Sequence, residues 1–156
     1  MEYKTNVMRM LDKAKIDYNS YTYSQDEALS GTEVANVLNQ DEKQVFKTLV
    51  TIGKTKKNYV FVIPVAEELD LKKAAAAVGE KSIEMIKSKD LLTATGYVHG
   101  GCSPIGMKKA FKTTVHLTAE NFDTIIFSAG KIGYQVEVKP SDLMKMIKFE
   151  LKDIVK

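Results

Sequence analysis

The alternation of apolar and polar residues predicts a chain of short strands and helices. Apolar residues recur at helical spacing after Thr5 or Asn6, either of which can cap a helix, and an alanine-rich run lies between Asp70 and Gly79. Helices are therefore expected over 6–16 and 71–78, shortly after Gly31, over 88–92 and from Pro140 onward. Alternating or β-branched runs predict strands over 18–23, 44–52, 59–63, 113–117, 124–127 and 134–138.

The order of these elements favours an α+β fold. Many predicted strands follow one another without an intervening helix, so we expect a mixed, curved β-sheet or barrel-like core surrounded by helices. The 156 residues suffice for one core, and we interpret 1–156 as a single domain. The closing helix is expected to bury Leu143, Met144, Met146 and Ile147.

The predicted strand over 44–52 carries one lysine in its middle. Successive strand residues point to opposite faces, so Lys47 shares a face with Val45 and Leu49. If that face is covered, desolvation lowers the lysine pKa unless an anion compensates, and the face therefore favours an anionic ligand. The pattern equally fits an edge-strand lysine that blocks aggregation or reaches into water.

A second informative stretch, 95–106, is rich in glycine. Its four glycines imply positive φ angles or close backbone approach, and such a loop can offer amide N–H groups to a ligand. The spacing and the terminal Gly-Lys-Ser/Thr of a Walker phosphate loop are absent, and an ordinary tight connection also fits. Tyr23, near the end of a predicted strand, fits either the mouth of a pocket or simple packing.

Composition narrows the class of protein. With 23 basic and 20 acidic residues, the net charge of +3 only mildly favours a polyanion. No apolar run approaches the roughly 20 residues that span a bilayer, and no signal core precedes the domain, so we expect a cytoplasmic protein without membrane contact. Two histidines and one cysteine give no metal signal, and we expect no cofactor. His99 and His116 have no evident catalytic partner, and Cys102 is interpreted as a packing residue.

Four ordered segments resemble one known family. Val45–Leu49, the segment from Pro64 to Lys73, the loop Thr95–Gly106 and Ser128–Lys131 together resemble the YbaK/EbsC family of Cys-tRNA(Pro) deacylases. That family is similar to the editing insertion domain of bacterial prolyl-tRNA synthetases. The resemblance implies a barrel-like mixed sheet and an enzyme that removes cysteine wrongly attached to the proline tRNA, acting on the acceptor end of the aminoacyl-tRNA.

The resemblance also assigns roles to residues. Lys47 would be the catalytic residue, and the substrate's own thiol would attack its carbonyl, so that no protein nucleophile is needed. The expected substrate-binding residues are Tyr23, Thr48, Gly100, Gly101, Ser103, Ser128, Gly130 and Gln135. The chain departs from the family at Ala129, where a second glycine is common, and at Gln135, where an acid is common. Glu137 lies on the same strand face as Gln135 and is a candidate replacement for that acid.

Two other functions stay open on the sequence. One is deacylation of Ala-tRNA(Pro) or another small aminoacyl-tRNA, with water as the nucleophile. The other is a non-catalytic module that binds aminoacyl-adenosine or a partner protein. Because the sequence carries no appended tRNA-binding domain, we also expect docking on prolyl-tRNA synthetase. The lysines of the turn 53–58 are interpreted as a solvated hairpin tip, although they could touch phosphates.

Overall fold

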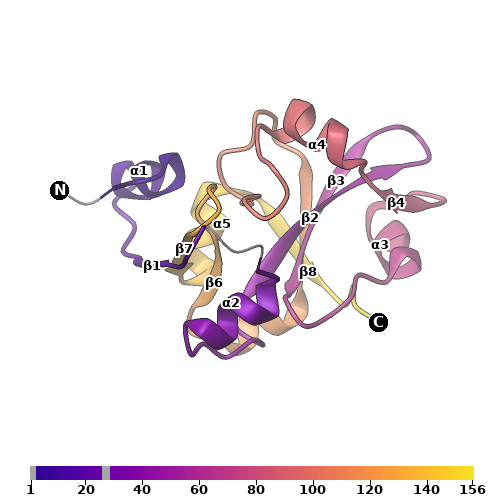
Figure 1. The fold of residues 1–156 in the computed structure, drawn as a ribbon. Coiled ribbons are helices and arrows are strands. Elements are labelled where there is room, and N and C mark those ends of the chain that lie inside the picture. The colour runs from indigo at the N-terminus through magenta and orange to yellow at the C-terminus, as the bar shows by residue number, and fades with distance from the viewer. Residues whose placement is uncertain (1–2, 26–28) are drawn as a thin grey trace.

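The computed structural model describes residues 3–25 and 29–156, and these form an α+β fold (Figure 1). The helices are α1 (Asn6–Lys13), α2 (Gly31–Val37), α3 (Leu71–Val78), α4 (Ser88–Thr95), α5 (Pro140–Met146) and the short 3₁₀ helix η1 (Leu117–Asn121). The strands are β1 (Asn19–Thr22), β2 (Phe46–Gly53), β3 (Asn58–Pro64), β4 (Ile83–Met85), β5 (Lys112–His116), β6 (Ile125–Ser128), β7 (Tyr134–Val138) and β8 (Phe149–Lys152).

The strands form an antiparallel three-stranded sheet and a mixed five-stranded sheet, which meet at the start of β2. One sheet has the order β1-β7-β6 and the other the order β4-β2-β3-β5-β8. The pairs β3–β5 and β5–β8 are parallel, and the remaining strand pairs are antiparallel. A parallel bridge between Val45 and Ile126 joins the two sheets. The predicted mixed sheet surrounded by helices is confirmed, and this junction takes the place of a closed barrel.

Three apolar clusters hold the layers together. The largest lies between the two sheets and α1, and includes Leu11, Phe46, Ile105, Val115, Phe127 and Leu143. A second packs α3 on the five-stranded sheet through Phe61, Ile63 and Ala74. A third joins α2 to the sheet junction through Ala35, Val45, Val65 and Ile126. The helices therefore cover the sheets from different sides. Strand β2 contributes residues to the first two clusters, and Val45, the residue just before it, belongs to the third.

Local sequence signals explain where three helices begin. The Thr5 side chain accepts a hydrogen bond from the Met8 N–H at the start of α1. A capping box joins Ser30 and Glu33 at the start of α2. Asp70 caps α3, which ends at Gly79 in the left-handed conformation. Each cap satisfies backbone N–H groups that have no partner inside the helix.

The structure corrects several sequence expectations. Helix α1 ends at Lys13 and not at 16, and strands β4 and β8 are absent from the sequence interpretation. Both strands are held by partners far away in the sequence, which a local pattern does not contain. Met144 is 44% exposed and does not share the buried side of α5 with Leu143. The face that α5 buries is therefore narrower than the apolar pattern predicts.

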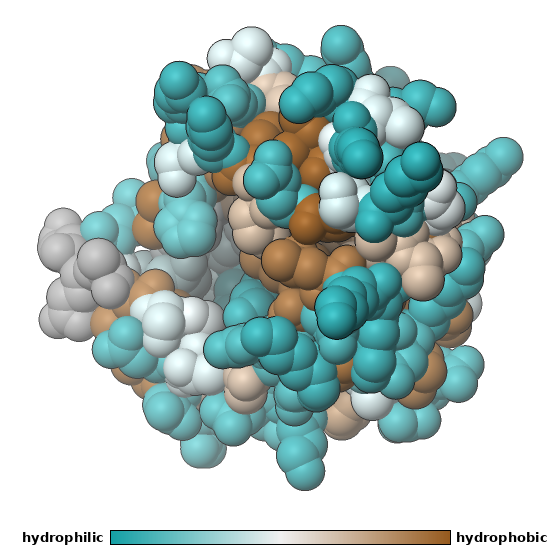
Figure 2. All heavy atoms as spheres, turned by 90° about the vertical axis from the view of Figure 1, so that its right-hand side faces the viewer, coloured by the Kyte–Doolittle hydropathy of each residue, from teal (hydrophilic) through white to brown (hydrophobic). Residues whose placement is uncertain are grey.

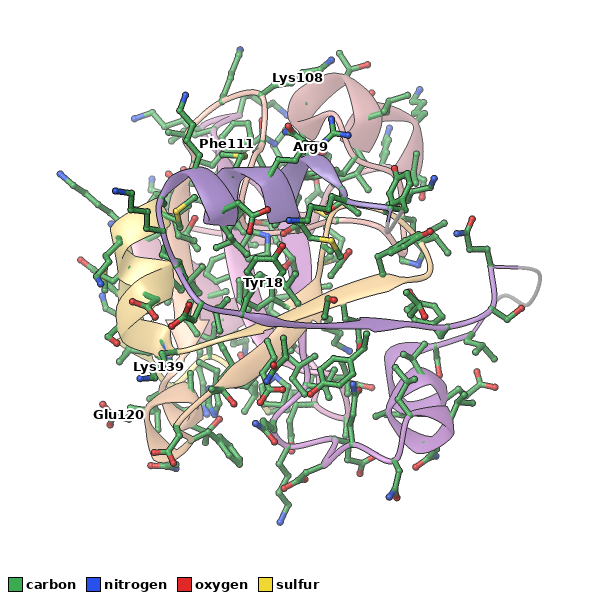
Figure 3. The ribbon with its side chains drawn as sticks, turned by 90° about the vertical axis from the view of Figure 1, so that its left-hand side faces the viewer. Arg9, Tyr18, Lys108, Phe111, Glu120 and Lys139 are labelled. Carbon is green, nitrogen blue, oxygen red and sulfur yellow. The ribbon has the colours of Figure 1, made fainter. Side chains whose placement is uncertain are left out.

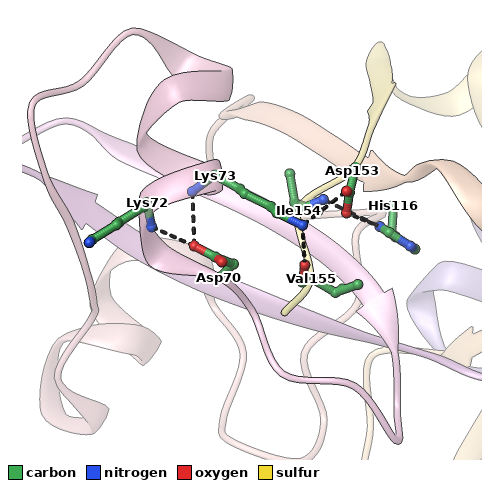
Figure 4. A network of polar contacts seen from close by, with 7 residues as sticks. All are labelled: Asp70, Lys72, Lys73, His116, Asp153, Ile154 and Val155. Atoms are coloured by element: carbon green, nitrogen blue, oxygen red, sulfur yellow. Dashed lines mark hydrogen bonds and ion pairs between the residues drawn. The ribbon is translucent and has the colours of Figure 1, made fainter.

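The segment that follows β8 is fixed by a polar network (Figure 4). Lys73 Nζ lies 2.9 Å from an oxygen of Asp153 and donates to the Val155 carbonyl at 2.8 Å. The Ile154 N–H donates to His116 Nδ1 at 3.3 Å. His116 is therefore held in place by a backbone N–H, a contact that fixes its ring and is not a partner for acid–base catalysis. Because Nδ1 accepts this bond, the neutral imidazole carries its hydrogen on Nε2.

Candidate functional site

Lys47 is a half-buried ammonium on β2. Its neighbours on the same strand face are Val45, which is buried, and Leu49, which is partly buried. Burial lowers the pKa of Lys47, and the charges of Glu68 and Glu67 offset part of that effect. Within residues 3–25 and 29–156, the Lys47 side chain has no hydrogen-bond or ion-pair partner. A desolvated cation of this kind is suited to binding an anion or a developing negative charge.

The strand register brings Ser128 and Gln135 onto the face that carries Lys47. Val45 and Ile126 are bridged in parallel and pack in the same cluster. Lys47 lies two residues after Val45, and Ser128 lies two residues after Ile126. The side chains of Lys47 and Ser128 therefore point to the face that carries Val45 and Ile126. Ser128 pairs with Gln135 across β6 and β7, and Gln135 pairs with Tyr21 across β7 and β1. A single surface therefore runs from β1 to β2, next to α2.

The glycine-rich loop borders this surface by contact with the turn that follows β6. A Cβ at Gly101 would lie 3.2 Å from the backbone N of Ile132, and one at Gly130 would lie 3.0 Å from the ring of Tyr97. Gly100 and Gly130 also have positive φ angles, of 88° and 90°. The structure therefore brings together the two segments that the sequence singled out, and larger residues would separate them.

Hydrogen bonds within the two segments decide which polar groups stay available. The Gly101 N–H donates to the Val98 carbonyl at 3.0 Å, so it is already occupied. The Ser103 hydroxyl accepts from the Ile105 N–H at 3.3 Å, and the Ser128 hydroxyl accepts from the Gly130 N–H at 3.1 Å. Because a hydroxyl that accepts one bond can still donate another, Ser128 keeps a donor for a ligand.

The backbone N–H groups of Gly100 and Ser103 have no acceptor within the described part of the chain. Ser103 is fully buried, and buried backbone donors are nearly always paired in folded proteins. The loop therefore offers fewer amide donors than its glycine content predicts, and of these two N–H groups only that of the exposed Gly100 faces the surface.

The side chains of Tyr23 and Thr48 lie on different faces relative to Lys47. Tyr23 follows β1, shares the face of Tyr21 and is fixed by its own N–H, which donates to the Gly133 carbonyl at 2.9 Å. Thr48 points to the opposite face of β2, the face that carries Phe46 in the largest cluster. Its buried hydroxyl has no partner among the described residues. Tyr23 thus lies on the same face as Ser128 and Gln135, whereas the Thr48 side chain does not.

The Gln135 amide is paired with a residue that the sequence analysis missed. Gln40 follows α2, and its Nε2 donates to Gln135 Oε1 at 2.8 Å, while Gln40 Oε1 is buried without a partner in the described chain. Gln135 is itself 5% exposed. The two residues are 95 positions apart and Gln40 stands in an ordinary polar stretch, so no local signal could have identified it. The pair presents an unsatisfied neutral acceptor where the family commonly has an acid.

The Glu137 carboxylate already accepts hydrogen bonds from neighbouring side chains. One of its carboxylate oxygens accepts from the Tyr21 hydroxyl and the other from the Thr124 hydroxyl. Burial raises the pKa of Glu137, but the hydrogen bonds from Thr124 and Tyr21 outweigh it, and the pKa lies below its ordinary value. The carboxylate is therefore charged and already bonded, so it does not replace the missing acid at Gln135.

Cys102 has the environment of a packing residue. Burial raises the pKa of its thiol to about 12, and the thiolate is the nucleophilic form of cysteine. Burial also raises the pKa of the neighbouring Tyr97 to about 12, and the Tyr97 hydroxyl donates to the Ile105 carbonyl at 2.5 Å. Cys102 is therefore protonated at neutral pH and only partly exposed.

Two hollows elsewhere on the surface differ from this site. One, of about 410 Å³, is lined by Lys43, Pro64, Glu67, His116, Thr118, Asn121, Phe122, Val155 and Lys156. The other, of about 570 Å³, is lined by Lys56, Lys57, Asn58, Tyr59, Val78, Ala110, Phe111 and Lys112. None of the predicted site residues lines either hollow, so size alone does not indicate the chemistry. The described residues contain no cluster of metal-ligating side chains and no helix long and apolar enough to span a membrane.

Comparisons with known proteins agree with the fold. A crystal structure of a candidate trans-editing enzyme for prolyl-tRNA synthetase superposes with a TM-score of 0.83 at 17% identity, over 99% of each chain. A hypothetical protein of known structure superposes with a TM-score of 0.87 at 18% identity, over 97% of this chain and all of the other. At these identities the likeness supports the fold alone.

Sequence comparisons give the family. The chain is 44% identical over 152 residues to EbsC of Enterococcus faecalis (strain ATCC 700802 / V583), named as a candidate Cys-tRNA(Pro)/Cys-tRNA(Cys) deacylase, covering 97% of this chain and 93% of that protein. The family described as the aminoacyl-tRNA editing domain matches residues 26–146. These residues include Lys47, the glycine-rich loop and Gln135. The chain therefore belongs to the aminoacyl-tRNA editing domain family.

Proposed function

We propose that this protein is a deacylase that removes cysteine from mischarged Cys-tRNA(Pro), with residues 1–156 acting as one editing domain. The observation that carries the proposal is the half-buried Lys47 ammonium, which has no partner within the described residues and shares a strand face with Ser128 and Gln135. The name of the Enterococcus faecalis relative supports this substrate.

The reaction needs positioning more than a strong protein nucleophile, because an aminoacyl ester is already activated. The thiol sulfur of the substrate attacks its own ester carbonyl, so that a C–S bond forms and the bond to the tRNA 3′-oxygen breaks. The thiol has given its proton to solvent before it attacks, the leaving 3′-oxygen takes a proton from the Lys47 ammonium, and cysteine leaves as a cyclic thiolactone. Lys47 then regains a proton from solvent. Lys47 stabilises the negative charge that develops on the carbonyl oxygen or on the leaving 3′-oxygen. Its lowered pKa makes its ammonium a better proton donor to that oxygen.

The remaining site residues hold the aminoacyl end in place. The Gly100 N–H and the Ser128 hydroxyl donate to the substrate, the buried Ser103 holds the loop through the bond that its hydroxyl accepts from the Ile105 N–H, and Gly101 and Gly130 allow their two segments to approach each other. Tyr23 borders the site from the β1 side, and Thr48 supports β2 from the core. The buried Gln40 oxygen beside Gln135 accepts from the substrate ammonium, since Glu137 is committed elsewhere.

We also propose that prolyl-tRNA synthetase supplies part of the tRNA selectivity. The site described above is sized for the aminoacyl group and the terminal adenosine, and that adenosine is common to all tRNAs. A protein of the same fold is described as a candidate trans-editing enzyme for prolyl-tRNA synthetase, and that description suggests the partner. Adding the synthetase is expected to raise the deacylation rate on Cys-tRNA(Pro) relative to Cys-tRNA(Cys).

One assay tests the proposed function. The protein and its Lys47→Ala variant are each incubated with Cys-tRNA(Pro), S-methylcysteinyl-tRNA(Pro), Ala-tRNA(Pro) and Pro-tRNA(Pro). We expect loss of cysteine only, blocked both by S-methylation and by the substitution. Cleavage of the alanyl ester instead would indicate a water-dependent deacylase. No cleavage of any ester would favour a non-catalytic binding module.

A further inference from the structure

The hollow of about 570 Å³, named here the lysine hollow, joins two lysine-rich segments that are far apart in the sequence. One is the turn between β2 and β3, with Lys56 and Lys57, and the other is the segment that leads into β5, with Lys112. They meet because Lys112 pairs with Tyr59 in the sheet. The two segments thus form one continuous surface.

Positive charge is concentrated around this hollow. Lys54, Lys56, Lys57, Lys108, Lys109 and Lys112 are all exposed, and they are six of the chain's 23 basic residues. Glu80, which lies against the same turn, is only 9% exposed and accepts hydrogen bonds from the Thr55 N–H and the Tyr59 hydroxyl. Its charge is therefore satisfied inside the protein. The net charge of +3 understates how strongly this surface attracts anions.

The lining of the hollow is not only charged. Val78, Ala110 and the partly buried Phe111 form an apolar part between the lysines. Figure 2 looks onto the side that carries α3, β4 and this turn, and apolar residues gather there within a rim of hydrophilic side chains. Figure 3 shows Lys108 and Phe111 at one end of the molecule, with Glu120 at the opposite end. Cations beside an aromatic ring are the usual elements of a surface that binds the nucleic-acid backbone.

The position of the hollow fits a substrate that is bound at Lys47. Lys54 lies seven residues after Lys47, just past the end of β2, which at about 3.3 Å per residue is roughly 23 Å along the strand. This is less than one turn of a nucleic-acid duplex, about 34 Å in B-form DNA. A tRNA whose aminoacyl end lies at Lys47 therefore has backbone phosphates within reach of the hollow.

We propose that the lysine hollow binds the sugar-phosphate backbone of the tRNA and supplies the affinity that the small aminoacyl end cannot provide. The inference rests on the proposed function in one respect, because that function makes tRNA the polyanion. Phosphates contact Lys56, Lys57 and Lys112, and a ribose or base packs on Phe111. Such contacts read no base sequence, so affinity is similar for different tRNAs and falls steeply with salt.

The test compares two triple variants that both change the net charge from +3 to −3. Lys56→Glu/Lys57→Glu/Lys112→Glu alters the hollow, and Lys13→Glu/Lys139→Glu/Lys148→Glu alters exposed lysines elsewhere. Fluorescence anisotropy measures binding of uncharged tRNA(Pro) at several salt concentrations. We expect the hollow variant to bind at least roughly tenfold more weakly, with a salt slope reduced by about 2 to 3, and the control to change much less.

Deacylation kinetics separate this inference from the proposed function. The hollow variant should raise KM for Cys-tRNA(Pro) with little change in kcat, and it should cleave the 3′-cysteinyl ester of adenosine as fast as the unaltered protein. Equal weakening by both triple variants, or none, would overturn the inference. Loss of binding to phosphatidylserine vesicles with tRNA binding intact would also overturn it, in favour of a membrane surface. If no ester is cleaved but tRNA binding falls only in the hollow variant, the proposed function fails and the lysine hollow stands.

Discussion

The two faces of β2 carry residues of opposite kinds. On one face, Phe46 and Val50 are each 2% exposed and pack in the largest apolar cluster. On the other face, Lys47 stands between a buried Val45 and a partly buried Leu49, with its ammonium only half covered. One strand therefore serves as a closed core on one side and as a chemical site on the other.

This difference explains why the strand can hold a costly charge. A desolvated ammonium without a partner reduces stability, and such a residue persists where the surrounding core supplies enough stability. The tightly packed face holds β2 in place, and the open face is then free to carry Lys47. Substitutions on the two faces test whether packing and chemistry are separated in this way.

The largest effect is expected on the closed face. Phe46→Ala removes a side chain that is 2% exposed and should lower the free energy of unfolding by about 3 to 5 kcal/mol, because a cavity remains. Chemical denaturation measures this change. Deacylation per folded molecule should be nearly unaffected, and a selective loss of activity would show that the two faces are not independent.

The next effect is expected on the open face. Lys47→Met keeps the apolar stem and removes the charge, so the deacylation rate should fall by about 10²–10³-fold, which equals about 2.7 to 4 kcal/mol. Single-turnover assays measure it. Burial lowers the pKa of Lys47 in the folded protein, so at every pH below that pKa the charged lysine costs folding free energy, and the variant should be slightly more stable at neutral pH. A clear loss of stability would mean that Lys47 is a structural residue.

A smaller effect is expected from Thr48→Val. The Thr48 hydroxyl is buried without a partner in the described chain, so replacing it with a methyl group should raise the free energy of unfolding by about 1 kcal/mol. Thermal and chemical denaturation measure the gain. The family resemblance gives Thr48 a role in the pocket, and a large loss of deacylation in this variant would place its hydroxyl in contact with substrate.

The smallest effect is expected from Cys102→Ala. With its pKa raised to about 12 by burial, this thiol is protonated at neutral pH, so the deacylation rate should not change. The same assay with Cys-tRNA(Pro) checks it. A loss comparable to that of Lys47→Met would identify Cys102 as a nucleophile and contradict attack by the substrate thiol.

The sequence predicts those features that depend on neighbouring residues. The alternation in 44–52 places the Lys47 side chain on the face of β2 that does not carry Phe46. The caps at Asp70 and Gly79 delimit α3 as expected. The order of the four motif segments along the chain is enough to indicate the family. The glycines of 95–106 indicate an unusual backbone, which the positive φ at Gly100 confirms.

What the sequence does not contain is the register between distant segments. The Val45–Ile126 bridge brings Lys47 toward Ser128, and it depends on how two strands some eighty residues apart align. The bond between Gln40 and Gln135 follows from the same packing, and it gives no local pattern. The hydrogen bond from the Tyr21 hydroxyl to the Glu137 carboxylate likewise depends on the pairing of β1 with β7. Pairings of this kind are set by the whole fold.

The pH dependence of deacylation tests the central claim most directly. Single-turnover rates on Cys-tRNA(Pro), corrected for spontaneous ester hydrolysis, are measured for the unaltered protein and for Lys47→Met. The account predicts a rate that rises as the substrate thiol ionises and then falls at a pH below 10.5, as the Lys47 ammonium with its lowered pKa loses its proton. Lys47→Met should lose the falling limb and keep the rising one. A falling limb that persists in Lys47→Met would contradict the account.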